Sequence, residues 1–481
     1  MTTATPLPRI PVLRKGQPYE SLDRNDLSAV GMEEPLGQIG QANTGMIRRD
    51  LLDLSNARDR LRDIPMSGLF DIFHKAGRIF LEEEVPISEE GPPQSRGDYI
   101  ETLSATSGLP HKLVRQNMEK IHHVFTHIEE IIKGLTRGLD PAVLDRGFGE
   151  QAGVAVGYYP TTDCLGVILP SNSPGVNSIW LPAVALKVPV ILKPGSEEPW
   201  TPLRIIQSLI MAGCPAEAFC FYPTDHEGAA TILQSCGRAI LFGDENTIHQ
   251  YAGNPNVQVH GPGWSKVILG ADEAEHWKDH LEVMVESILA NGGRSCINAS
   301  AIVTASHGEE IAEALGDILA RIEAKPPEDK EACLAAFANA GFADYIDSEI
   351  EEGLKTEGAD DVTARFRTGP RKVEVEGRTY LHPTIIHCAN LDHPLANREF
   401  LFPYASVVEV PQEDMLDRIG PTLVASAITK DEAFKQELLR SRLIQRLNLG
   451  PIPTSSIRWD QPHEGNLFEF LYQRRAIQHS N

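Results

Sequence analysis

The sequence predicts an α/β protein with two domains, each built on a mainly parallel sheet. From residue 163 to 264, short apolar strands alternate with helical segments, and a second alternation runs from 265 to 430. Strands joined through helices align in parallel, and the helices then cover both faces of the sheet. The 481 residues suffice for two or three buried cores.

The first alternating region is typical of a doubly wound, Rossmann-type sheet. Its apolar runs occupy 164–170, 188–194, 218–223 and 238–243, with helical spacing over 176–186, 201–212 and 226–235. Ligands bind such sheets beyond the carboxyl ends of the strands. The residues that follow these strands are therefore binding candidates, namely Asn172, Lys193, Ser196, Thr224, Gly243 and Asp244.

The second region and the flanks complete the predicted organisation. Residues 111–139 place apolar side chains at helical spacing, and 153–160 alternate as a strand does. In the second domain we expect helices at 276–290 and 308–323, strands at 299–304, 379–386, 405–410 and 422–428, and a return to a sheet at 443–453. The predicted segments are a mainly helical N-terminal part (1–145), a β arm (146–162), the first sheet (163–264), the second domain (265–430) and a C-terminal segment (431–481).

Charge and cysteine usage exclude several classes of partner. The 67 acidic residues outnumber 44 Lys and Arg, giving a net charge of -23, and such a surface repels nucleic acid and anionic lipid. No apolar run reaches membrane-span length, and the N-terminus lacks the apolar core of a secretory signal. The seven cysteines are scattered without a CxxC pair, which favours free thiols in a reducing cytoplasm and no metal site.

One cysteine stands in a segment typical of a nucleophile. Cys296 lies in NGGRSCINAS (291–300), after two glycines and Arg294, between a predicted helix and a predicted strand. Glycines let backbone amides approach a reacting atom closely, and a nearby cation or helix end lowers the pKa of a thiol. Taken alone, the segment fits a structural cysteine equally well.

Six separated motifs, in order, show that the sequence resembles the aldehyde dehydrogenase superfamily over about residues 150–450. They are LGVILPSNSP (165–174), ILKPGSEEPWTP (191–202), NGGRSC (291–296), YLHPTII (380–386), NREFLFP (397–403) and LVASAITKD (423–431). The resemblance implies a Rossmann-type cofactor domain, a second α/β catalytic domain with the active site between the two, and a small β arm that joins subunits into dimers or tetramers.

The resemblance also assigns roles to residues. It makes Cys296 the nucleophile that adds to an aldehyde, with the Asn172 side chain and the Cys296 amide stabilising the oxyanion. It places Lys193 and Glu399 on the two riboses of NAD or NADP, and Pro170, Ser171, Ser196 and Gly243 in the cofactor-binding loops. Hydride transfer to the nicotinamide then leaves a thioester on Cys296.

The fate of that thioester is open because the sequence departs from the hydrolytic pattern. Where hydrolytic members carry a general-base Glu, this chain has His260, followed by Gly-Pro-Gly (261–263). Histidine titrates near neutrality and can activate water. CoA-acylating members and acyl reductases lack the Glu and have a similar loop, so we place exchange with CoA slightly ahead of hydrolysis. The substrate is an aldehyde or an acyl thioester, and the candidates for lining its pocket are the loops that carry Trp180, Trp200, Trp264 and Trp459.

Two further departures concern the cofactor. Gly243 is followed by acidic Asp244 and Glu245 where a phosphate is expected at a helix N-terminus, unless Asp244 caps that helix. Ser196 replaces a Glu that repels the 2'-phosphate of NADP, although Glu197 and Glu198 follow it, so both NAD and NADP stay open. An alternative of a different class is a non-catalytic relative retained as a binding subunit.

Overall fold

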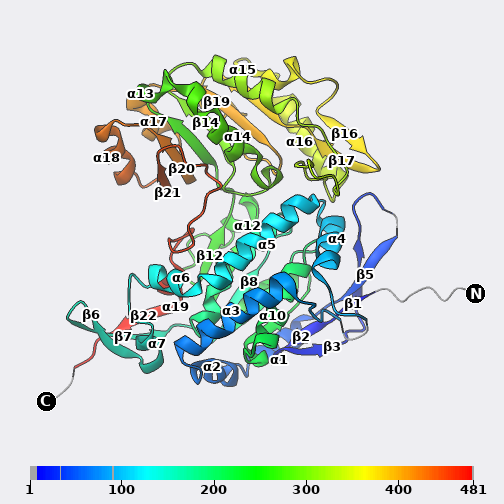
Figure 1. Cartoon of the computed structure of the whole chain (residues 1–481), viewed down its shortest axis with the longest axis vertical. Helices are drawn as coiled ribbons and strands as arrows, with labels where there is room; N and C mark the ends of the chain where they lie inside the picture. Colours follow the sequence, from blue (N-terminus) through cyan, green and yellow to red (C-terminus); the bar gives the residue numbers. More distant parts are fainter. Residues whose placement is uncertain (1–7, 33, 89–90, 479–481) are drawn as a thin grey trace, which may run out of the picture. The chain divides into compact units, whose positions relative to one another are not determined.

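The computed structural model describes residues 8–32, 34–88 and 91–478 and divides into two units (Figure 1). Unit 1 comprises residues 1–106, 114–261 and 458–481, and unit 2 comprises 107–113 and 262–457. Each unit contains a seven-stranded, mainly parallel sheet, as the alternation of strands and helices predicts.

The large sheet of unit 1 has the strand order β12-β11-β8-β9-β10-β2-β3. Its five parallel strands are β8 (Leu165–Ile168), β9 (Val190–Lys193), β10 (Phe219–Phe221), β11 (Arg238–Phe242) and β12 (Val257–His260). Among the parallel strands, β8 forms first and lies in the middle. The next two strands, β9 and β10, lie on one side of β8, and β11 and β12 lie on its other side. This reversal is the topological switch point at which doubly wound sheets bind ligands.

Residues 9–40 form strands, although the sequence analysis included them in a mainly helical segment. β2 (Val12–Arg14) and β3 (Gln17–Tyr19) extend the large sheet in antiparallel fashion, and a separate three-stranded sheet contains β1 (Arg9–Ile10), β4 (Arg24–Ser28) and β5 (Pro35–Gly40). The prolines and glycines of this segment disfavour helix, and Val12 and Leu13 are fully buried in β2, between β10 and β3.

Helices begin at Thr44 and cover the sheet of unit 1. The predicted helix over 176–186 is divided into α8 (Asn177–Trp180) and α9 (Pro182–Ala185), with Pro182 opening the second piece as proline at a helix start does. The remaining helices before residue 260 are α1 (Thr44–Leu51), α2 (Ser55–Arg62), α3 (Met66–Glu82), α4 (Arg96–Ser107), α5 (His111–Thr126), α6 (Ile128–Leu135), α7 (Ala142–Arg146), α10 (Trp200–Ala212), α11 (His226–Ser235) and α12 (Glu245–His249).

The predicted β arm is present and gains a strand from the C-terminus. β6 (Phe148–Gln151) and β7 (Val154–Pro160) form a hairpin, and β22 (Tyr472–Arg475) pairs with β7 after the short helix α19 (Leu467–Leu471). In Figure 1 this sheet joins segments from the middle and the end of the chain.

The sheet of unit 2 is covered on both faces. Its order is β15-β18-β19-β14-β13-β20-β21, with only β15 antiparallel. One face packs on α14 and α15, and the other packs on α16, α17 and α18. The elements are β13 (Ser265–Leu269), β14 (Ala299–Thr304), β15 (Ala359–Asp361), β18 (Thr384–Cys388), β19 (Tyr404–Glu409), β20 (Thr422–Ile428), β21 (Ile444–Leu449), the hairpin β16 (Lys372–Val375) and β17 (Arg378–Leu381), α13 (Ala271–Ala274), α14 (Leu281–Leu289), α15 (Gly308–Leu319), α16 (Ala340–Gly353), α17 (Gln412–Arg418) and α18 (Glu432–Arg440).

Within residues 8–32, 34–88 and 91–478, no helix combines the length and the apolar character needed to cross a bilayer.

A buried arginine ties α10 to the N-terminal helices. Arg204 is fully buried, and its guanidinium donates to the carbonyls of Phe80 (2.9 Å), Glu83 (2.8 Å) and Gln94 (2.9 Å). It also lies over the Tyr99 ring, 5.5 Å from the centroid. Burial lowers its pKa to about 10, so the guanidinium stays charged at neutral pH and its three carbonyl partners hold it.

We predict that Arg204→Met lowers the free energy of unfolding by about 3 kcal/mol, because three buried carbonyls lose their donor. Urea denaturation followed by circular dichroism measures the change. The matched control is Arg78→Met. Arg78 is 63% exposed, and its ion pair with Glu83 is long, at 4.0 Å, so this substitution should change the free energy of unfolding by less than about 0.5 kcal/mol. Equal effects of the two substitutions would contradict the prediction.

Candidate functional site

The carboxyl edge of the unit 1 sheet collects most of the predicted binding residues. Lys193 ends β9, His260 ends β12, and Asn172 follows β8 as a half-buried residue. The register pairs Ile168 with both Lys193 and Leu241, and Phe242 with His260. Parallel strands bring their carboxyl ends to one edge, so these side chains lie along one side of the sheet.

The loop after Lys193 is packed closely against the loop after β8. A side chain on Gly195 would meet the Pro170 carbonyl oxygen at 2.5 Å, so only glycine fits there. The Glu197 amide donates to Ser171 Oγ at 3.2 Å. The structure thus brings together Pro170, Ser171 and Lys193, as the resemblance implies.

Of the two glutamates that follow Lys193, only Glu197 places a negative charge near its ammonium group. Burial lowers the pKa of Lys193, while the Glu197 carboxylate opposes that shift. The Ser196 hydroxyl donates to Glu197 at 2.8 Å, so a negative charge lies directly beside Ser196. Glu198 is fully buried and accepts from the Thr201 amide at 3.1 Å, and burial raises its pKa to about 8. Glu198 is therefore part of the fold and not of the binding surface.

Asp244 caps a helix, which settles one alternative left open by the sequence. Its carboxylate accepts from the Thr247 amide at 2.8 Å at the start of α12, and this bonding lowers the pKa of Asp244. Gly243 precedes the cap and donates its amide to the His260 carbonyl oxygen. The structure thus shows Asp244 as a helix cap, and the assignment of Gly243 to a cofactor-binding loop stays a prediction.

His260 contacts a residue that the sequence analysis did not single out. Its side chain is 2% exposed, and Nδ1 lies in hydrogen-bond contact with the Glu464 carboxylate. Its Nε2 forms no hydrogen bond with any residue that the structure describes. The Phe242 ring packs against the imidazole, with 4.7 Å between the ring centroids. Glu464 stands 204 positions later in the chain, in a loop with no local signal of pairing.

A third side chain joins this pair. His463 lies with its ring 6.2 Å from that of His260, and ligand atoms of His260, His463 and Glu464 all lie within 4.8 Å of one another. Two imidazoles and a carboxylate are also a donor set that Zn²⁺ accepts. The arrangement therefore allows two kinds of chemistry, a base oriented by a carboxylate or a metal site.

A pocket adjoins His463 and extends between α6, α8 and the sheet. It encloses roughly 410 Å³ of space, part of it open solvent. Apart from His463, the lining side chains are uncharged, and among the tryptophans only Trp459 contributes. Trp180 and Trp200 themselves belong to the core and are 0% and 1% exposed, whereas Ser178, Ile179 and Pro182 of the segment that carries Trp180 line this pocket. The lining residues are Ile131, Leu135, Ser178, Ile179, Pro182, Ile240, Gln258, Trp459, Gln461, His463, Gly465 and Leu467.

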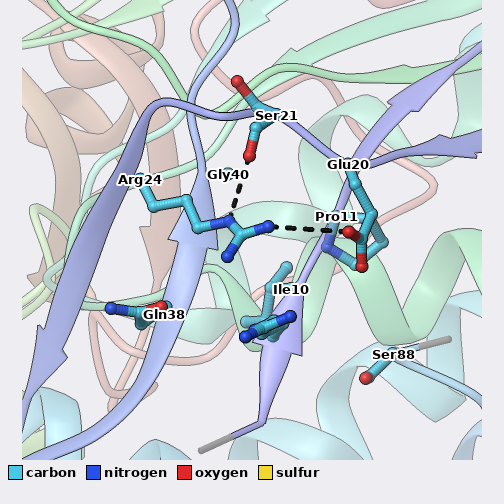
Figure 2. A pocket seen from close by; sticks show the side chains of 9 residues that line it. Ile10, Pro11, Glu20, Ser21, Arg24, Gln38, Gly40 and Ser88 are labelled. Atoms are coloured by element: carbon cyan, nitrogen blue, oxygen red, sulfur yellow. Dashed lines mark hydrogen bonds and ion pairs between the residues drawn. The ribbon is translucent and has the colours of Figure 1, made fainter. Parts of the chain in front are cut away.

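A second pocket lies among the N-terminal strands and has no catalytic group (Figure 2). Arg24 donates from Nε to the Ser21 carbonyl oxygen at 3.0 Å and pairs with Glu20 at 3.5 Å, which neutralises its charge. The pocket encloses roughly 340 Å³, part of it solvent, and its lining contains neither cysteine nor histidine. Nothing here resembles a reaction site.

In unit 2, the predicted nucleophile lies at the amino edge of the sheet. Cys296 is half-buried between a short turn (Ala290–Gly293) and β14. Asn291, Gly292 and Gly293 all have positive φ angles, of 54°, 65° and 70°. A side chain on Gly293 would come within 2.3 Å of the Phe402 backbone, so the sequence Asn-Gly-Gly permits this tight path.

The loop before β13 packs against Cys296. The Ser265 hydroxyl donates to the Cys296 carbonyl oxygen at 2.8 Å. A side chain on Gly263 would come within 2.0 Å of the same oxygen, so the Gly-Pro-Gly loop needs glycine at this place. Glu399 accepts from the amides of Gly263 (2.9 Å) and Trp264 (2.7 Å). The structure therefore joins Cys296, the Gly-Pro-Gly loop and Glu399 into one cluster.

Two polar residues beside Cys296 hold its loop in place. Asn298 donates to the carbonyls of Ser287 and Ala290 at 3.1 and 2.9 Å, and accepts from the Ser295 amide at 2.9 Å. Arg294 is buried and donates to the Ser107 carbonyl oxygen at 2.6 Å. Its guanidinium donates to backbone carbonyls, so Arg294 holds neighbouring backbone segments in place.

These observations agree with a comparison of the sequence with protein families. The model described as "Aldehyde dehydrogenase family" matches residues 94–420. The chain belongs to the aldehyde dehydrogenase family. It is thereby an oxidoreductase of the aldehyde dehydrogenase type, as the six motifs predict.

Individual relatives are distant in sequence. A Staphylococcus haemolyticus protein, named as an aldehyde dehydrogenase, is 23% identical over 85% of this chain and 83% of its own length. The structure is similar to the aldehyde dehydrogenase KauB from Pseudomonas aeruginosa, with a TM-score of 0.79 and 17% identity over 98% of this chain and 96% of that one. It is similar also to indole-3-acetaldehyde dehydrogenase complexed with NAD+, with a TM-score of 0.79 and 16% identity over 97% and 96% of the two chains. These structural matches confirm the predicted aldehyde-dehydrogenase-like fold.

We predict that iodoacetamide modifies Cys296 first in the native protein. Burial raises the pKa of Cys214 and Cys388 to about 12 and that of Cys220 to about 11, and a thiol without thiolate does not react. Cys333 is the internal comparison, because it is half-buried like Cys296 and burial raises its pKa. Peptide mass spectrometry of samples quenched over time, at pH 7.5, measures both rates. Faster labelling of Cys333 would contradict an activated Cys296.

Proposed function

We propose that the protein oxidises an aldehyde with NAD(P), using Cys296 as the nucleophile. The observation that carries the proposal is the cluster around Cys296. Cys296 follows a tight turn that needs glycine at position 293. The Ser265 hydroxyl and the closely packed Gly263 hold the backbone carbonyl of Cys296 in place. Fixing the backbone of a nucleophile without covering its side chain is what covalent catalysis requires.

The reaction proceeds in two stages on Cys296. The thiolate adds to the aldehyde carbon, and the resulting oxyanion is stabilised by the Asn172 amide group and the Cys296 backbone amide. NAD(P), held by Lys193 and Glu399, would supply the acceptor for the hydride that leaves this carbon. The carbonyl re-forms as a thioester on Cys296. An acceptor then adds to the thioester carbon, the carbon–sulfur bond breaks, and Cys296 leaves as a thiolate.

The cofactor fits the carboxyl edge of the unit 1 sheet. The strand order reverses there between β8 and β11, and the Lys193 side chain forms no hydrogen bond with the described residues, so its ammonium is available to a ribose. Glu197, beside Ser196, gives a negative charge where a 2'-phosphate would lie. We therefore assign NAD ahead of NADP. Asp244 places a carboxylate at the N-terminus of α12, which disfavours a pyrophosphate there, so we assign the main cofactor contacts to the Lys193 loop.

Water is the acceptor that the arrangement of His260 favours. The sequence placed CoA slightly ahead, since the Gly-Pro-Gly loop resembles that of acylating enzymes. In the structure, Gly263 of that loop donates its amide to Glu399 and packs against the Cys296 carbonyl oxygen. The loop therefore supports the backbone around Cys296. His260, by contrast, has Nδ1 on a carboxylate, which orients the imidazole as a general base needs; its Nε2 is buried and forms no hydrogen bond with the described residues.

We predict that the purified protein reduces NAD with members of an aldehyde panel, followed at 340 nm, and that Cys296→Ala abolishes this activity. Cys333→Ala is the matched control and should keep the wild-type rate, because Cys333 lies outside the cluster. The panel is run with and without free CoA. Dependence on CoA would show that a thiol accepts the acyl group, and absence of activity under all conditions would favour the non-catalytic binding subunit.

We further propose that the β6-β7-β22 sheet joins subunits. In the described part of the chain β6 is an edge strand whose ladder partner is β7, and Phe148 and Val154 are 45% and 53% exposed, so this sheet presents apolar side chains that a second copy can cover. We predict a dimer or tetramer by size exclusion with light scattering, and Phe148→Lys should lower the molar mass. A wild-type monomer would contradict this role of the sheet.

A further inference from the structure

We propose that His260, His463 and Glu464 form a binding site for a divalent transition metal ion, and that Zn²⁺ is the ion that fits it best. All three side chains belong to unit 1. The inference goes beyond the proposed function, since no step on Cys296 uses a metal ion. Local spacing in the sequence does not reveal the site, because His260 and Glu464 stand 204 positions apart.

The donor atoms of the three side chains are of the types that Zn²⁺ binds, and they lie near one another. One ligand atom of each residue lies within 4.8 Å of the other two. A tetrahedral Zn²⁺ holds nitrogen and oxygen ligands about 2.1 Å away, which places them about 3.4 Å from one another. The Glu464 carboxylate lies closer than this to His260 Nδ1 and, at 4.0 Å, somewhat farther from His463 Nε2. Rotation of the side chains can therefore bring the three donors to one ion.

The charge of the cluster favours a cation. The Glu464 carboxylate is only 10% exposed, and in the described part of the chain its ion-pair partners are the two histidines, not a lysine or an arginine. A carboxylate with so little hydration needs a nearby positive charge, either a proton on a histidine or a bound ion. Mg²⁺ and Ca²⁺ prefer ligand sets of oxygen, so a site with two imidazoles selects Zn²⁺ over them.

The His260 ring can bind an ion without loss of any other hydrogen bond. Its side chain is 2% exposed and packs against the Phe242 ring, with 4.7 Å between the centroids. Among the described residues, the hydrogen bond of the ring is the one that Nδ1 forms with Glu464. An ion that takes the place of the proton in this hydrogen bond keeps both side chains in contact with a positive charge.

The loop that carries Glu464 is held in place before any ion binds. The Gln258 side chain donates to the Glu464 carbonyl oxygen, and Asn466 donates to the Leu135 carbonyl oxygen at 2.9 Å. Glu464 itself has a φ of 49°, and Gly465 follows with a φ of 112°, so the backbone turns sharply at the proposed ligand. A ligand presented by fixed backbone costs little entropy when it binds an ion.

A pocket gives an ion access to the cluster. His463 lines the pocket of roughly 410 Å³ that is partly open to solvent, and the Trp459 ring lies 6.4 Å from the His463 ring. Three protein ligands leave a tetrahedral Zn²⁺ with one further position. We assign this position to a water molecule that enters through the pocket.

Metal binding and the proposed base role of His260 exclude each other at one moment. An imidazole that gives its lone pair to an ion does not take a proton from water, so the metal-loaded chain would lack the base proposed above. The two proposals are therefore tested separately. Metal binding is measured without substrate, and aldehyde oxidation is measured in the presence of a chelator.

The test is a titration of the full-length protein with zinc chloride alone, after treatment with a chelator and dialysis. Isothermal titration calorimetry should show one Zn²⁺ per chain. The seven free cysteines can also bind zinc, so the same protein is titrated with Co²⁺ and its absorption spectrum is recorded. Thiolate ligands add a strong charge-transfer band in the near ultraviolet, whereas imidazole and carboxylate ligands do not. We expect a cobalt spectrum without this band.

Variants identify the ligands. His463→Asn and Glu464→Gln should each weaken zinc binding at least about 100-fold, more than the loss of an outer-shell partner costs. Glu469→Gln is the matched control, because it removes an exposed carboxylate that pairs with Arg137 in the same C-terminal region, and it should bind zinc as the wild type does. Cys296→Ala should also retain the ion. Circular dichroism verifies the fold of each variant, and His260→Gln replaces any ligand variant that does not fold.

Three results would overturn the proposal: no zinc binding by the wild-type protein, a thiolate band in the cobalt spectrum, or undiminished binding by the folded ligand variants. Zinc binding that the ligand variants lose and Glu469→Gln keeps would establish the site. That result would hold even if the protein oxidised no aldehyde, so a failure of the proposed function is distinguishable from a failure of this inference.

Discussion

Burial of both faces of a parallel sheet is the constraint on which this structure depends. Helices cover each face of the unit 2 sheet, and the central strands of both sheets are almost wholly apolar and buried. Polar groups in such strands have no partners, so chemistry is confined to the strand ends. Lys193 and His260 accordingly end strands of unit 1, while Cys296 precedes a strand of unit 2.

The residues at these edges depend on backbone that is held by their neighbours. Asn298 fixes the Cys296 loop through two carbonyls at the adjoining helix end and the amide of Ser295, and Glu399 fixes the end of the Gly-Pro-Gly loop through the amides of Gly263 and Trp264. Glycines at 195, 263 and 293 provide the close approaches that any larger residue would block. A few residues without reactive groups therefore determine where the reactive ones lie.

The sequence predicted those parts of the structure that local patterns encode. Strands β14 and β20 match the predicted ranges because alternation and apolar character are local properties, and the cap formed by Asp244 follows from its place before a helix. The N-terminal strands were missed because β2 is stable only through pairing with β10, a partner some 200 residues away. Glu464 was missed for the same reason, since no pattern near 464 reports a contact with 260.

The contact between His260 and Glu464 gives the histidine at position 260 a carboxylate partner. A glutamate base carries its own charge and needs only a position. A histidine also needs a defined tautomer and a counter-charge once it is protonated, so exchanging one for the other is incomplete without a second residue. The carboxylate at 464 contacts His260 from a loop that Gln258 fastens to the same strand. In the proposed hydrolysis this carboxylate would meet both requirements, so the departure at position 260 has a matching residue elsewhere in the fold.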